Sequence, residues 1–131
     1  MVDFAMAVDK SASPAAVRVM VIEDEPLIAM AMKMVLETLH YDVVAVVDNS
    51  ADAIDMAHQH QLDLVLADAR LKAGDDGIGA VKQILDCQPV KVLFITGNPA
   101  EVAARGMGYM DILTKPFMPT MLKKKLQTIM S

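Results

Sequence analysis

A short apolar run that ends on a carboxylate constrains the fold of this chain more than any other feature. The run spans Leu62-Asp63-Leu64-Val65-Leu66-Ala67-Asp68, and the sequence Gly-Asp-Asp-Gly at 74–77 breaks the chain before the next helical pattern. Such a run is typical of a buried strand, so Asp68 is expected at the carboxyl end of a strand, beside a loop. Open α/β sheets place their functional groups at this edge.

Four more runs have the length and composition of buried strands, and helical patterns separate them. The predicted strands are residues 17–22, 43–47, 62–68, 90–95 and 111–114, and the predicted helices are 26–39, 50–60, 79–87 and a last one from about 120. Residues 100–110 contain Gly106 and Gly108 and favour a weak helix at best. Strands that alternate with helices in this way predict an α/β fold, a doubly wound five-stranded parallel sheet with helices on both faces.

Length and composition narrow the possible classes of protein. A chain of 131 residues is expected to form one domain, residues 17–131, after a flexible lead-in, residues 1–16, with no room for a separate output domain. The lead-in lacks the basic start and apolar run of a signal peptide, and no stretch is long enough to cross a membrane. A net charge of -5 with 12 scattered Lys and Arg argues against nucleic-acid binding. Cys87, the single cysteine, is expected to be a small buried side chain in a reducing, cytoplasmic compartment.

The first predicted helix has two apolar stripes. One stripe holds Ile28, Met32, Val35 and Leu39, and the other holds Leu27, Met30 and Met34. We assign the first stripe to the core because it contains the branched residues. The second is either an exposed contact surface or covered by flanking loops, and the sequence leaves both open because methionine also fills irregular cores.

Polar side chains with definite chemistry follow four of the predicted strands. They are Glu23 and Asp24 after the first strand, Asp68 after the third, Thr96 after the fourth and Lys115 after the fifth. The carboxyl ends of parallel strands share one edge, so these groups are expected to converge on one crevice. Three carboxylates close together repel one another unless a proton or a hard cation is present. Oxygen ligands without a nearby His or Cys indicate Mg²⁺ rather than zinc.

This set of groups suits phosphoryl transfer. Asp68 can act as a carboxylate nucleophile, while Mg²⁺ and Lys115 neutralise phosphoryl oxygens and the Thr96 hydroxyl donates to another. The product would be an aspartyl phosphate. Each residue alone is more often a cap or a turn residue, so the prediction rests on their conjunction at one edge.

The motifs that carry these residues resemble the receiver domain of two-component response regulators. They are Ile22-Glu23-Asp24-Glu25-Pro26, Asp63-Leu64-Val65-Leu66-Ala67-Asp68, Phe94-Ile95-Thr96-Gly97 and Thr114-Lys115-Pro116-Phe117, within a similarity that covers about residues 17–130. The resemblance implies a flavodoxin-like (βα)5 fold, a phosphoacceptor at Asp68 and a cis bond between Lys115 and Pro116. It also implies Mg²⁺ held by Glu23, Asp24, Asp68 and the main-chain carbonyl of Arg70.

Two features set the chain apart from most receivers. Ile112 stands at the switch position, three residues before Lys115, where receivers usually have an aromatic side chain, and the segment from Thr96 to Lys115 is short. Both features resemble the FATGUY-type subgroup of single-domain receivers, which is named for a Phe-Ala-Thr-Gly-type motif. We therefore expect a short or mobile fourth helix, with residues 97–110 becoming ordered on phosphorylation, in place of an aromatic flip coupled to Thr96.

The resemblance implies a single-domain response regulator and not an enzyme, apart from self-phosphorylation and slow self-dephosphorylation. It would accept a phosphoryl group from a phosphohistidine on a sensor histidine kinase or a histidine phosphotransfer protein. It would then signal by contact with a downstream protein, and neither nucleic acid nor a membrane is an expected partner. The predicted docking surface comprises Pro26, Ala29, Met30 and Met34 on the first helix.

Two other functions use the same residues. A HAD-like Mg²⁺-dependent aspartyl-phosphate phosphatase needs the same nucleophile and Lys, but it has a second Asp two positions after the nucleophile, where this chain has Arg70. A non-phosphorylated receiver-like interaction module is the other alternative. A flavin site is disfavoured because the acids at 23–25 would repel a phosphate. The long side chain of Arg70 beside an acyl phosphate also predicts a persistent phosphorylated state.

Overall fold

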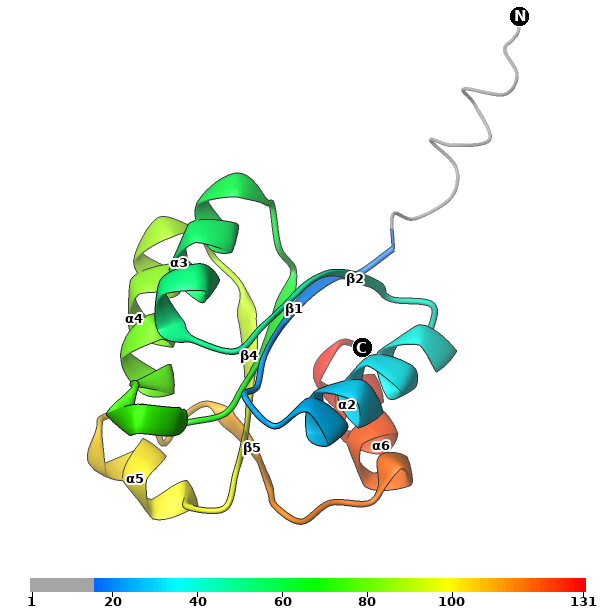
Figure 1. Ribbon diagram of the computed structural model, residues 1–131. Helices are drawn as coiled ribbons and strands as arrows, with labels where there is room; N and C mark the ends of the chain where they lie inside the picture. The colour runs from blue at the N-terminus through cyan, green and yellow to red at the C-terminus, as the bar shows by residue number, and fades with distance from the viewer. Residues whose placement is uncertain (1–15) are drawn as a thin grey trace, which may run out of the picture.

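The predicted strands pair in one parallel sheet. In the computed structural model of the protein (Figure 1), which describes residues 16–131, the strand order is β2-β1-β3-β4-β5. The strands are β1 (Arg18–Ile22), β2 (Asp42–Val47), β3 (Leu64–Ala67), β4 (Lys91–Thr96) and β5 (Asp111–Thr114). The chain crosses from β2 over β1 to β3, so the winding reverses there, as in a doubly wound sheet. The lead-in predicted for residues 1–16 lies outside the described residues, apart from its last position.

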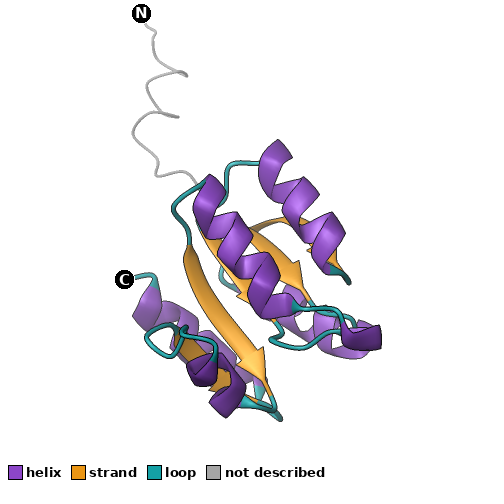
Figure 2. Cartoon of the chain, turned by 90° about the vertical axis from the view of Figure 1, so that its left-hand side faces the viewer, coloured by secondary structure: helices purple, strands orange, loops and turns teal. Residues whose placement is uncertain are grey.

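Helices cover both faces of the sheet. They are α2 (Pro26–Thr38), α3 (Ser50–Gln59), the 3₁₀ helix η1 (Lys72–Gly74), α4 (Gly77–Cys87), α5 (Pro99–Ala104) and α6 (Pro119–Ile129). α2 and α6 pack on one face, and α3, α4 and α5 pack on the other, which is the face turned toward the viewer in Figure 2. This arrangement confirms the predicted flavodoxin-like (βα)5 fold, including a short helix, α5, before β5. Within residues 16–131, no helix has the length and apolar character needed to cross a membrane.

Alternation along each strand divides the core between the two faces of the sheet. In β1, Met20 and Ile22 pack on the side of α3 and α4, whereas Val19 and Val21 pack on the side of α2 and α6. All four side chains are fully buried. Strands buried on both faces need nearly continuous apolar sequence, which is why these strands stand out in the chain as apolar runs.

The second apolar stripe of α2 is exposed, so the alternative in which loops cover it is wrong. Leu27, Met30 and Met34 are 80%, 57% and 60% exposed. The buried residues of the helix are Ala29, Met32, Val35 and Leu36. The stripe assigned to the core does face it, because Met32 and Val35 are buried there and Ile28 and Leu39 are partly buried and pack against the same cluster.

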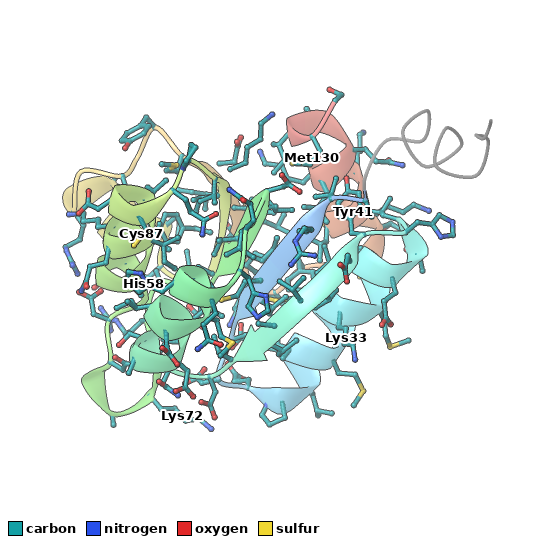
Figure 3. All side chains as sticks on the ribbon, turned by 90° about the horizontal axis from the view of Figure 1, so that it is seen from above. Lys33, Tyr41, His58, Lys72, Cys87 and Met130 are labelled. Carbon is teal, nitrogen blue, oxygen red and sulfur yellow. The ribbon has the colours of Figure 1, made fainter. Side chains whose placement is uncertain are left out.

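Cys87 is exposed, which corrects the prediction of a buried side chain. It is the last residue of α4. Its sulfur lies 3.6 Å from the ring nitrogens of His58 on α3 (Figure 3). The pair lies far from the carboxylates at the other end of the sheet and is not part of their site.

Gly77 allows the start of α4 to lie against the end of β3. A Cβ atom at this position would be 1.9 Å from the carbonyl oxygen of Asp68, which is a backbone atom and cannot rotate away. Gly79 differs, because a Cβ atom there would meet Oδ2 of Asp76 at 2.6 Å, the far end of a side chain that can move. The close approach at Gly77 therefore fixes the position of Asp68.

Replacing Gly77 by Ala is expected to destabilise the fold by about 2–3 kcal/mol, because the start of α4 and Asp68 must move apart. The matched variant Gly79→Ala is expected to change stability by less than about 1 kcal/mol, since a gain in helix propensity offsets a weakened Asp76 cap. Urea unfolding of both variants measures the difference. Equal effects in the two variants would contradict the tight contact at Gly77.

Candidate functional site

The structure brings the predicted polar residues to one edge of the sheet. Glu23 directly follows β1, Asp68 directly follows β3, Thr96 ends β4 and Lys115 directly follows β5. Glu23, Asp68 and Thr96 are 2%, 6% and 2% exposed. Buried polar side chains need partners, so their contacts define the site.

Lys115 is the centre of these contacts. Its ammonium nitrogen lies 2.9 Å from Oδ2 of Asp68, 2.9 Å from Oε1 of Glu23 and 3.7 Å from Oε2 of Glu25. Burial alone would lower the pKa of Lys115, but its ion pairs with Glu23 and Asp68 outweigh burial and raise the pKa above its ordinary value. Lys115 therefore stays charged and neutralises the two buried carboxylates.

Glu23 is the most strongly desolvated acid of the site. Burial raises the pKa of Glu23 above its ordinary value, and the neighbouring Lys115 offsets only part of this effect. Its Oε2 accepts a hydrogen bond from the main-chain N–H of Glu25 at 3.1 Å. Its Oε1 contacts the Lys115 ammonium without the geometry of a hydrogen bond, so this buried oxygen has no hydrogen-bond partner among the described residues. Such an oxygen is a natural ligand for a cation.

Carboxylate oxygens of Glu23, Asp24 and Glu25 lie within 4.8 Å of one another and could hold a metal ion. Glu25 was not among the predicted ligands, although the run of three acids in the sequence contains it. Asp24 accepts a hydrogen bond from the main-chain N–H of Lys72 at 2.6 Å, which ties it to the loop after β3. An all-oxygen set of this kind suits a hard cation such as Mg²⁺.

Asp68 faces a pocket at this edge. Its Oδ2 accepts from Lys115, and its Oδ1 accepts from the main-chain N–H of Arg70 at 3.2 Å. The pocket has a volume of about 370 Å³ and is lined by Asp24, Glu25, Asp68, Arg70, Leu71 and Lys72. The side chain of Arg70 turns to Glu101 on α5, with its Nη2 atom 2.9 Å from Oε1. The predicted residues Asp24, Asp68 and Arg70 thus share one cavity.

The two predicted switch residues lie on neighbouring strands but not opposite each other. Thr96 pairs with Thr114, whereas Ile112 pairs with Phe94. The Thr96 hydroxyl oxygen accepts a hydrogen bond from the main-chain N–H of Asn98 at 3.0 Å. Ile112 is partly buried and packs against the core on the side of α4 and α5. Residues 97–110 contain α5 and a turn, and their ordering on phosphorylation stays a prediction.

Three of the four predicted docking residues are accessible. Pro26 is exposed, and so are Met30 and Met34. Ala29 is 7% exposed and offers little surface, because it faces β2 and lines a small pocket there. An apolar groove of about 460 Å³ lies between α2 and the segment that joins β5 to α6, and it is lined by Leu27, Ile28, Ala31, Lys115, Pro116, Phe117 and Pro119. The groove reaches Lys115 and so adjoins the site.

Replacing Lys115 by Met is expected to lower stability by about 2–3 kcal/mol near neutral pH, because two buried carboxylates lose their cation. Burial already raises the pKa of Glu23, and loss of Lys115 raises it further. Glu23 then takes up a proton as the pH falls through this raised pKa, so the stability deficit shrinks toward acid pH.

Urea unfolding of wild type and Lys115→Met at several pH values measures this dependence. Lys125→Met is the control, because the Lys125 ammonium lies on the surface, 3.8 Å from Asp111. We expect that control to stay within about 0.5 kcal/mol of wild type at every pH. A Lys115→Met deficit that does not change with pH would contradict the prediction.

Comparison with known proteins agrees with this geometry. A family model described as the response regulator receiver domain matches residues 19–127. The phyllosphere-induced regulator PhyR of Methylorubrum extorquens is 34% identical over 110 residues, which are 82% of this chain and 41% of that protein. The chain therefore spans less than half the length of this relative.

Solved structures show the same relationship. The receiver domain of PhyR from Erythrobacter litoralis superposes with a TM-score of 0.82 at 30% identity, covering 88% of this chain and 91% of that chain. A crystal structure of PhyR from Bartonella quintana, described as an anti-anti-sigma factor, has a TM-score of 0.74 at 35% identity over 95% of this chain and 51% of that chain. With most of its length matched by the family model, this chain belongs to the response regulator receiver domain family.

Proposed function

We propose that Asp68 accepts a phosphoryl group from a phosphohistidine on a sensor histidine kinase or a histidine phosphotransfer protein, and that the chain then signals by protein contact. The observation that carries the proposal is the 2.9 Å contact between the Lys115 ammonium and Asp68 at the acid-lined edge of the sheet. This contact places a cation where a phosphoryl group on Asp68 would develop negative charge.

In the proposed reaction, a carboxylate oxygen of Asp68 attacks the phosphorus atom of the phosphohistidine. The new O–P bond forms as the P–N bond breaks, and the electron pair of that bond returns to the imidazole nitrogen of the donor. Lys115 neutralises one phosphoryl oxygen. Thr96, which is 2% exposed, ends β4 next to β3, and its hydroxyl donates to a second phosphoryl oxygen. Positioning and charge neutralisation supply the catalysis.

The residues present fit a Mg²⁺ ion. Glu23, Asp24, Asp68 and the main-chain carbonyl of Arg70 would hold it, and Glu25 adds a further carboxylate within the same cluster. The buried Glu23 oxygen that lacks a hydrogen-bond partner supports this assignment. When bound, Mg²⁺ neutralises charge on the transferring phosphoryl group.

The structure favours this function over an aspartyl-phosphate phosphatase. That chemistry needs an acid two residues after the nucleophile, where Arg70 instead forms an ion pair with Glu101. A metal-free interaction module would not be phosphorylated at Asp68, and labelling with acetyl phosphate tests this alternative. Because the relative from Bartonella quintana is described as an anti-anti-sigma factor, we infer that the downstream partner of this chain is also a protein.

The residue at the switch position indicates how phosphorylation of Asp68 would be signalled to a partner. Ile112 has no hydroxyl or aromatic ring to follow Thr96, so the signal is proposed to pass through residues 97–110 and not through an aromatic flip. Membership of the FATGUY-type subgroup stays a prediction.

Incubation of wild-type protein with acetyl phosphate and Mg²⁺ is expected to add the mass of one phosphoryl group, and Asp68→Ala is expected to add none. Intact mass spectrometry measures both. The control is Asp63→Ala, which removes an acid just before the same strand and should label like wild type. Labelling of Asp68→Ala to the same extent would exclude Asp68 as the acceptor.

The exposed methionines on α2 predict the docking surface for the phosphohistidine protein. Met30→Glu is expected to slow transfer from a phosphohistidine protein that labels wild type by about tenfold or more, while labelling by acetyl phosphate stays intact. Tyr109→Glu is the control, because Tyr109 is 76% exposed and follows α5, which packs on the face of the sheet opposite α2. Equal loss of both reactions in Met30→Glu would place the defect in the site itself and exclude α2 as the docking surface.

A further inference from the structure

Arg70 joins the edge of the site to α5. Its main-chain N–H donates to Oδ1 of Asp68 at 3.2 Å, and the residue lines the pocket that Asp68 faces. In its guanidinium group, Nε donates a hydrogen bond to Oε1 of Glu101 at 3.1 Å, and Nη2 lies 2.9 Å from the same oxygen. One residue therefore contacts both the carboxylate of the site and the first turn of α5.

The position of α5 depends on such contacts. The helix has six residues, too few to be stable on its own, and Asn98 makes no side-chain hydrogen bond at its N-cap. Val102 is its one buried residue. The helix lies beside the loop between β3 and α4 (Figure 1). An ion pair joins each end of the helix to a residue of this loop. At the second end, Nη2 of Arg105 lies 2.7 Å from Oδ2 of Asp76.

The ion pair between Arg70 and Glu101 is easily exchanged. The Arg70 side chain is 65% exposed, and ion pairs at this level of exposure contribute little net stability. A phosphoryl group on Asp68 would present nearly two negative charges and three acceptor oxygens within two residues of Arg70. Guanidinium groups bind such oxyanions through two hydrogen bonds, whereas Glu101 offers Arg70 a single oxygen.

We propose that Arg70 is a two-position switch between Glu101 and the phosphoryl group of Asp68. This inference rests on the proposed function. In the unphosphorylated chain Arg70 holds the first turn of α5 through Glu101. After phosphorylation Arg70 turns to the phosphoryl group, and residues 99–105 lose one of their two ion pairs with the region around β3 and α4. The change is opposite in sense to the ordering expected from the sequence, and it alters the surface that α5 and the exposed Tyr109 offer to a protein partner.

Amide hydrogen exchange of peptides that cover residues 97–106 tests the switch, with and without acetyl phosphate and Mg²⁺. In wild type we expect exchange to become about three- to fivefold faster on phosphorylation. In Arg70→Gln, exchange should already be faster before phosphorylation and should not change further. Glu101→Gln should behave in the same way. Intact mass of each sample shows that all three proteins carry the phosphoryl group.

Arg105→Gln is the matched control, because it breaks the other ion pair of α5 without touching Asp68. Its exchange should be faster in both states, and the further increase on phosphorylation should remain. A phosphorylation-dependent increase in Arg70→Gln equal to that of wild type would overturn the switch, and so would slower exchange in phosphorylated wild type. If wild type gains no phosphoryl mass, the proposed function fails and the switch fails with it, which distinguishes that result from a failure of the switch alone.

Discussion

The ammonium group of Lys115 connects the strand ends at the edge of the sheet that carries the candidate site. Lys115 follows β5, yet its contacts at 2.9 Å are with Asp68 after β3 and Glu23 after β1. β4 lies between β5 and β3, so the side chain reaches across the strand with which β5 pairs. The main-chain N–H of Lys115 donates to the carbonyl oxygen of Thr96 on β4 at 2.9 Å, and this hydrogen bond fixes the position of the Lys115 backbone. Because desolvation of buried ion pairs largely cancels their attraction, the benefit of this arrangement lies in position more than in stability.

Much of this edge could be predicted from the sequence, for a simple geometric reason. The central strands β1, β3 and β4 are buried on both faces, so each apolar run ends where the chain leaves the core, as at Ala67 before Asp68 and at Ile22 before Glu23. Parallel strands then place these ends side by side without any further information. The fold class, the convergence of Glu23, Asp68, Thr96 and Lys115, and the short α5 all follow from this rule and from the glycines before β5.

Details that depend on rotation or on distant packing could not be predicted. Consecutive residues on a helix differ in direction by about 100°, so a small error in orientation separates buried Ala29 from Met30, which is 57% exposed. Among three consecutive acids, the sequence does not show that Glu23 turns into the core and Glu25 stays exposed. Cys87 is exposed because α4 ends there, and a boundary of a helix is the least predictable part of it. The pair between Arg70 and Glu101 joins residues 31 positions apart and depends on where α5 settles on the sheet.

The placement of α5 links these unpredicted contacts to Asp68 by two routes. The first runs through Arg70, whose main chain contacts the Asp68 carboxylate and whose side chain contacts the start of α5. The second runs through the start of α4, where Gly77 lies against the Asp68 carbonyl and Asp76 contacts Arg105 at the end of α5. The buried side chain of Val102 lies between these two attachments. A six-residue helix has too few internal hydrogen bonds to resist a change at either attachment, so its orientation follows the residues that flank Asp68 more closely than it follows its own sequence.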